Sequence, residues 1–106
     1  MYLDMGSLSD FINELKGVKK KDSIRLGIIE GTRNTEAGPI VTVQIVLTYK
    51  LNKEDVLRYV ELHNGPLAYF NDELKSFAKR MEERKNEIVK ELNQNGFNVK
   101  SGVWTI

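Results

Sequence analysis

The sequence predicts an α+β fold that forms one domain over residues 1–106. Three observations lead to this prediction: a long helical pattern over residues 66–93, two alternating strand patterns over residues 24–29 and 39–49, and a third over residues 97–106. A chain of 106 residues can bury one modest core but not two. We therefore expect a small three-stranded antiparallel sheet, made of a hairpin and a C-terminal strand, with one long helix and two short helices over one face.

The predicted long helix is amphipathic, because apolar residues recur along it at steps of three and four. Its apolar stripe comprises Leu67, Phe70, Leu74, Phe77, Met81, Ile88 and Leu92, and Ala78 and Val89 widen it. Pro66 suits a first helical turn, and Gly96 suits the residue that follows a helix. Arg84 interrupts the stripe. The core-facing part is therefore predicted most clearly over residues 67–81, which we expect to pack against the inward side chains of residues 41–49.

A short first helix is predicted to follow a loose lead-in at residues 1–6. Ser7 can accept a bond from an unpaired backbone N–H group, and Asp10 completes the spacing of a capping box. The apolar face then consists of Leu8, Phe11, Ile12 and Leu15. Gly17 suits the end of this helix. A helix of about ten residues is unstable alone in water, so it must pack on the sheet.

The two strands of the predicted hairpin alternate apolar and other side chains. In the first strand Ile24, Leu26 and Ile28 share one face, and residues 32–38 form a long projecting loop. The opposite face mixes aliphatic and polar residues: Ile29, Ile40, Val46, Thr42, Gln44 and Thr48. Such a face is usually covered in part, so we expect the first helix or another subunit to lie over it. Isolated exposed aliphatic side chains are the plainer alternative.

A second short helix is predicted between the hairpin and the long helix. Asn52 and Asp55 have the spacing of a helix cap. The helix should run to Leu62 and end before Pro66, which disfavours helical conformation in the preceding residue.

The C-terminal strand, over residues 97–106, is predicted to contain a β-bulge at residues 101–102.

Composition sets few limits on function. The net charge is +1 and the chain has no cysteine, so it offers no global attraction to polyanions, no disulfide and no thiolate metal site. The first residues lack the features of a secretory signal, and no stretch is apolar enough for a membrane span. We expect a cytoplasmic protein with no cofactor and no metal. Abundant Lys, Glu and Ile also lean toward a thermophilic source.

The residues give little support for catalysis. His63 is the single histidine, and its place beside the predicted helix break suits a capping contact better than a metal ligand or a general base. We find no phosphate-binding loop and no nucleophile motif. A small-ligand binder or enzyme stays open as one alternative, with Tyr49, His63 and Trp104 in the wall of a cleft between sheet and helices.

Nucleic-acid binding is the sharper alternative, because basic residues cluster near the start of the hairpin. The candidate residues are Lys16, Lys19, Lys20, Lys21, Arg25 and Arg33, with Arg33 on the hairpin loop. Acidic residues are interspersed among them, and the paired strand aromatics typical of single-stranded RNA binders are absent. A solubilising connector is the plainer interpretation of the lysines.

The leading functional hypothesis is a small non-catalytic binding or scaffold protein that works as a homodimer or a larger homo-oligomer. A small three-stranded sheet has two exposed edges, and the predicted long helix extends past the sheet. Association of two copies, by edge pairing or by packing of the long helices, would cover both features.

Overall fold

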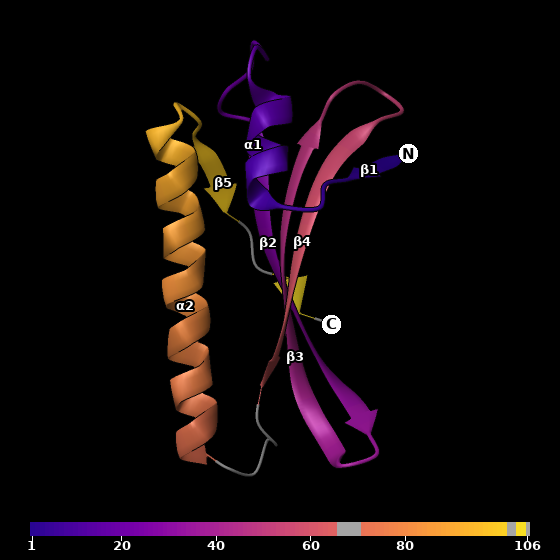
Figure 1. Cartoon of the computed structure of the whole chain (residues 1–106), viewed down its shortest axis with the longest axis vertical. Coiled ribbons are helices and arrows are strands. Elements are labelled where there is room, and N and C mark those ends of the chain that lie inside the picture. Colours follow the sequence, from indigo (N-terminus) through magenta and orange to yellow (C-terminus); the bar gives the residue numbers. More distant parts are fainter. Residues whose placement is uncertain (66–70, 102–103, 106) are drawn as a thin grey trace.

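The computed structural model describes residues 1–65, 71–101 and 104–105. The elements in chain order are β1 (Tyr2–Asp4), α1 (Leu8–Leu15), β2 (Ile24–Thr35), β3 (Gly38–Lys50), β4 (Val56–Gly65), α2 (Asn71–Gln94), β5 (Val99–Ser101) and β6 (Trp104–Thr105). One sheet and two helices form an α+β fold, which confirms the predicted class (Figure 1).

The strands form one mixed sheet in the order β1-β4-β3-β2-β5, and β6 also pairs with β2. Strand β3 is antiparallel to both of its neighbours, whereas β1 is parallel to β4, and β5 and β6 are parallel to β2. The prediction of a three-stranded, purely antiparallel sheet is therefore wrong in detail. Helix α2 carries the chain back past the sheet after β4, so the chain enters β5 in the direction of β2. The predicted bulge at residues 101–102 includes Gly102, which lies outside the described residues, so it stays a prediction.

Helix α1 forms as predicted. The Oγ of Ser7 accepts a hydrogen bond from the backbone N–H of Asp10 at 3.1 Å, and Gly17 follows the helix with φ 95°. The four apolar side chains of the helix are all buried. The residues before α1 are not a loose lead-in but contain β1, because Met5 N–H and Met1 C=O both bond to β4 at 2.8 Å.

The prediction of a second short helix is wrong, because its residues form strand β4. The Oδ1 of Asn52 accepts the backbone N–H groups of Glu54 at 2.8 Å and Asp55 at 2.9 Å. These bonds close the turn between β3 and β4 instead of capping a helix. The same side-chain bond to the backbone can serve either structure.

The hairpin of β2 and β3 is longer and its loop shorter than predicted. The register pairs Thr35 with Gly38, so residues 36–37 alone connect the strands. Gly38 has φ 116°, a conformation that favours glycine. Arg33 lies inside β2 opposite Ile40, not on a loop.

Helix α2 packs most tightly through its second half. Its buried side chains are Phe77, Ile88 and Leu92, whereas Leu74 and Met81 are only half-buried. Leu67 and Phe70 of the predicted stripe lie outside the described residues. Ile88 and Leu92 of the predicted stripe have no exposed surface, so the core-facing part of the described helix continues beyond Arg84.

Both helices contribute to one core on one side of the sheet, which we call the inner face. The buried core comprises Leu8, Phe11, Ile12, Leu15, Ile24, Leu26, Ile45, Leu47, Tyr49, Leu57, Ile88, Leu92 and Phe97. The alternate residues of the central strands form the opposite side, which we call the outer face: Arg25, Ile29, Gln44, Val46, Thr48, Arg58, Val60 and Leu62. Helix α1 packs on the inner face, so of the two predicted covers for the outer face, the first helix or another subunit, the first helix is wrong.

Candidate functional site

The outer face exposes aliphatic side chains on a regular sheet. Val60 is 38% exposed and Leu62 is 50% exposed, both on β4. Val46 on the adjacent strand β3 lies opposite Val60 and is only 7% exposed. No helix in the described part of the chain covers this strip. A contiguous apolar strip on an uncovered sheet is typical of an interaction surface.

Strand β4 also has an open backbone edge. Strand β1 is short and pairs only with the first three residues of β4. The N–H of Val56 and the C=O of Arg58 bond to that region. Because backbone groups alternate along a strand, those of Val60, Leu62 and Asn64 point to the same edge. None of the described residues pairs with this part of the edge, so the open edge and the exposed aliphatic side chains coincide.

A groove of about 320 Å³ crosses the outer face near β1. The guanidinium of Arg58 lies 4.2 Å from the centre of the Tyr2 ring and donates to the Asp4 carboxylate at 2.5 and 3.0 Å. The hydrogen bond from Arg58 lowers the pKa of Asp4. Arg58 is therefore neutralised in place, and Arg25 is the second cation that lines the groove.

A polar cluster joins β4 to α2 on the inner face, centred on Glu61. Arg84 donates to both carboxylate oxygens, from Nε to Oε1 at 2.6 Å and from Nη2 to Oε2 at 2.9 Å. The Tyr59 hydroxyl donates to Oε2 at 2.7 Å, and His63 Nε2 lies 2.6 Å from Oε1. The Glu61 side chain is 14% exposed. Four contacts from three side chains thus occupy the roughly four lone-pair positions of a carboxylate.

The bonding of Glu61 makes it a poor catalytic base. The hydrogen bonds from Arg84 lower the pKa of Glu61 to about 2, against the opposing effect of burial. The same bonds raise the pKa of Arg84, and burial raises the pKa of Tyr59. A carboxylate that stays ionised and fully bonded cannot take up a proton near neutral pH. The cluster holds the helix against the sheet.

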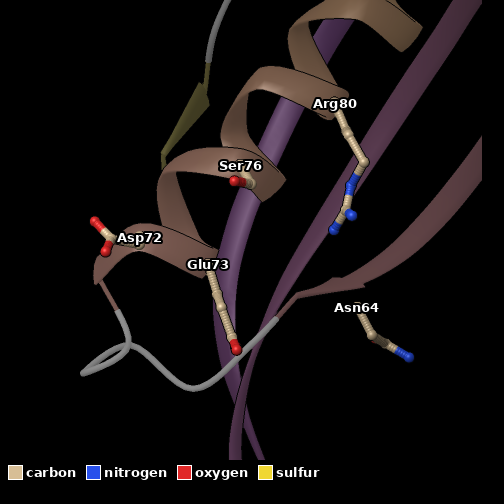
Figure 2. A pocket seen from close by; sticks show the side chains of 5 residues that line it. All are labelled: Asn64, Asp72, Glu73, Ser76 and Arg80. Carbon is tan, nitrogen blue, oxygen red and sulfur yellow. The ribbon is translucent and has the colours of Figure 1, made fainter.

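A cleft of about 450 Å³ opens between the end of β4 and the first turns of α2. Figure 2 shows the side chains around it: Asn64, Asp72, Glu73, Ser76 and Arg80. Charges of both signs line the cleft, and its described lining residues include no histidine or lysine that could activate the Ser76 hydroxyl. We therefore assign no chemistry to it.

A third cleft, of about 480 Å³, lies where the connector after α1 meets the ends of β3 and β4. Three cations line it, Lys20, Arg25 and Lys50, together with the hydroxyl residues Ser23 and Thr48. No aspartate or glutamate is among its described lining residues. We call this the basic cleft.

The structure unites only two of the six basic residues predicted to bind nucleic acid. Lys20 and Arg25 line the basic cleft, and Lys16, Lys19 and Lys21 are exposed on or beside the connector. Arg33 lies eight residues along β2 from Arg25, roughly 26 Å away at the usual strand rise. Lys50 was not predicted as a binding residue. It reaches the cleft because the register of β3 against β4 places the end of β3 there, and this register is not visible in the sequence.

The three residues predicted to line one ligand pocket lie in separate places. Tyr49 is buried in the core at 6% exposure and is also one of the residues that line the basic cleft. His63 is in strand β4, not at a helix end, and contacts Glu61. The backbone of Trp104 pairs with Ile29 on the β2 edge. His63 pairs with Val43, six residues along β3 from Tyr49, so these side chains do not share a cleft wall.

Sequence reasoning missed Glu61, although one signal pointed toward it. Arg84 occupies a position in the helical stripe where an apolar residue is expected, which indicates a partner on the packed side. That partner stayed hidden because the segment of Glu61 was assigned to a helix.

Among the described residues no group of three metal-ligating side chains comes together, and no helix is long and apolar enough to cross a membrane. Comparison with known proteins finds no matching family model, no similar curated protein and no similar solved structure.

Proposed function

We propose that this protein is a non-catalytic binding protein that forms a homodimer through the open edge of β4. The supporting observation is the coincidence, at Val60 and Leu62, of unpaired backbone groups with exposed aliphatic side chains. An open strand edge is a template for another strand, and native proteins usually pair or protect such edges.

A second copy of the chain is the occupant that this edge fits best. Two identical edges can pair antiparallel about a two-fold axis, so each N–H meets a C=O of the partner. An axis near Leu62 would bring Val60 and Leu62 of both copies onto one outer face. Two sheets of this kind would then form one continuous sheet with the helices on the inner face. The composition supports a cytoplasmic location, which forms part of the proposal.

The alternative of a contact between the long helices has weaker support. The surface of α2 is dominated by charged residues, and its best-buried side chains already pack on the core. An apolar helix stripe left over for a partner is not a feature of the described helix, since Phe77, Ile88 and Leu92 are buried within one copy.

The test is the mass in solution of the chain and of Leu62→Pro. Proline at this position removes an N–H that faces the open edge and leaves the ladder bonds to β3 intact. By sedimentation velocity at tens of micromolar, we expect the unmodified chain at about twice its mass of 12.2 kDa and the variant at the single mass. Ser9→Glu, on the exposed surface of α1, is the control and should remain dimeric.

Circular dichroism of Leu62→Pro distinguishes loss of pairing from loss of folding. The variant should keep its spectrum, because proline is tolerated on edge strands whose N–H faces outward. An unmodified chain that sediments only at 12.2 kDa would refute the dimer.

A further inference from the structure

We propose that the basic cleft binds a ligand through a phosphate group. The cleft gathers Lys20, Arg25 and Lys50 from three separate segments of the chain, and about 480 Å³ is room for a ligand of nucleotide size. The inference is independent of the proposed dimer, because one copy supplies every lining residue.

No ion pair among the described residues uses the charges of the cleft. Each carboxylate that forms an ion pair in the described chain does so with Arg58, His63, Arg84 or Lys85. Lys20, Arg25 and Lys50 take part in none of these pairs. Asp22 is close in sequence, but it does not line the cleft. Three like charges around one opening repel one another, and an anion between them removes that cost.

The donors suit phosphate in geometry as well as in charge. The guanidinium of Arg25 can donate two parallel hydrogen bonds to phosphate oxygens, and the two lysines supply mobile point charges. Ser23 and Thr48 are half-buried and add hydroxyl donors. A carboxylate ligand would use fewer of these donors, because it has one oxygen less.

The backbone that carries these side chains is fixed by regular contacts. Arg25 pairs with Thr48 across β2 and β3, and Lys50 pairs with Val56 across β3 and β4. The connector that carries Lys20 is held at Lys21, whose C=O accepts from the Asn98 N–H at 2.8 Å. A cleft built on fixed elements loses little entropy when it binds a ligand.

Titration calorimetry at low salt with AMP, adenosine and a ten-nucleotide single-stranded DNA tests the proposal. We expect AMP to bind and adenosine not to bind, and inorganic phosphate to compete with AMP. If the DNA binds more tightly than AMP, with an affinity that falls as salt rises, the phosphate comes from a nucleic acid; tighter binding of AMP points to a small phosphate ester. Either result supports the site. If neither AMP nor the DNA gives a heat of binding, the proposal is rejected.

A pair of double variants separates the cleft from general surface charge. Lys20→Ala with Lys50→Ala should weaken phosphate binding about tenfold or more, because two charge-assisted contacts are lost. Lys19→Ala with Lys53→Ala removes the same charge from neighbouring exposed positions outside the cleft and should change affinity less than about twofold. Equal losses in the two double variants would overturn the proposal. Leu62→Pro should bind AMP as the unmodified chain does, so failure of the dimer leaves this test valid.

Discussion

Arg84 on helix α2 donates to both carboxylate oxygens of Glu61 on strand β4, at 2.6 and 2.9 Å. The two residues lie 23 positions apart in the chain. Among the ion pairs of the described residues, this one links α2 to the sheet. Both side chains are largely shielded from water, with 32% of Arg84 and 14% of Glu61 exposed. The pair therefore fixes where the helix lies along the sheet.

The Glu61→Gln variant should lose about 2 kcal/mol of unfolding free energy, because Arg84 keeps its charge in a half-buried place without the carboxylate. Urea denaturation followed by circular dichroism measures the loss. The neighbouring pair of Lys85 and Glu82 is the matched control, since the Glu82 side chain is 60% exposed. Glu82→Gln should change stability by less than about 0.5 kcal/mol. Equal effects of the two variants would contradict the anchoring role of Glu61.

Stability should fall in acid over a window set by Glu61. Its pKa is about 2 in the folded chain and near 4.5 when unperturbed. Because the folded value is the lower one, the contribution is complete above pH 5 and is lost as pH falls from about 5 to 2. The difference in unfolding free energy between the unmodified chain and Glu61→Gln should shrink across this window. A difference that stays constant from pH 6 to pH 3 would show that Glu61 is not held ionised.

The parts of the fold that were predicted correctly have strong local signals. Ser7 and Gly17 mark the ends of α1, and the period of two along residues 39–49 marks β3. Each of these features depends on neighbours within a few residues. The long helix was likewise predicted from its period, although its two side chains without exposed surface, Ile88 and Leu92, lie in its second half.

Strand β4 was missed because both of its faces carry apolar residues. Val60 and Leu62 on the outer face hide the alternation with Leu57 and Tyr59 on the inner face, so spacings of three and four gave a helical pattern. The β-branched and aromatic residues of the segment favoured a strand. The partners of Glu61 could not be found from sequence, because the register of β4 places it beside α2.

Gly65→Ala should destabilise the protein by about 1–3 kcal/mol through overpacking. A methyl carbon built at Gly65 would lie 2.5 Å from two ring carbons of Phe77, a side chain that is only 3% exposed. The backbone of Gly65 has no positive φ, so space alone decides the effect. Gly31→Ala is the control, because its nearest neighbour would be the Thr42 hydroxyl at 3.4 Å. Stability measured by urea denaturation should fall for Gly65→Ala only, and Phe77→Leu should relieve that loss.

Leu92→Ala should cost more stability than Leu74→Ala. Leu92 has no exposed surface and contacts the core shared with α1, so its truncation leaves a cavity worth about 2–5 kcal/mol. Leu74 is half-buried near the start of α2, and water can reach the space that its truncation leaves. Alanine favours helix at both positions, so helix propensity does not separate the two variants. Thermal and urea unfolding of both variants would measure the difference, and an equal loss would contradict the tighter packing of Leu92.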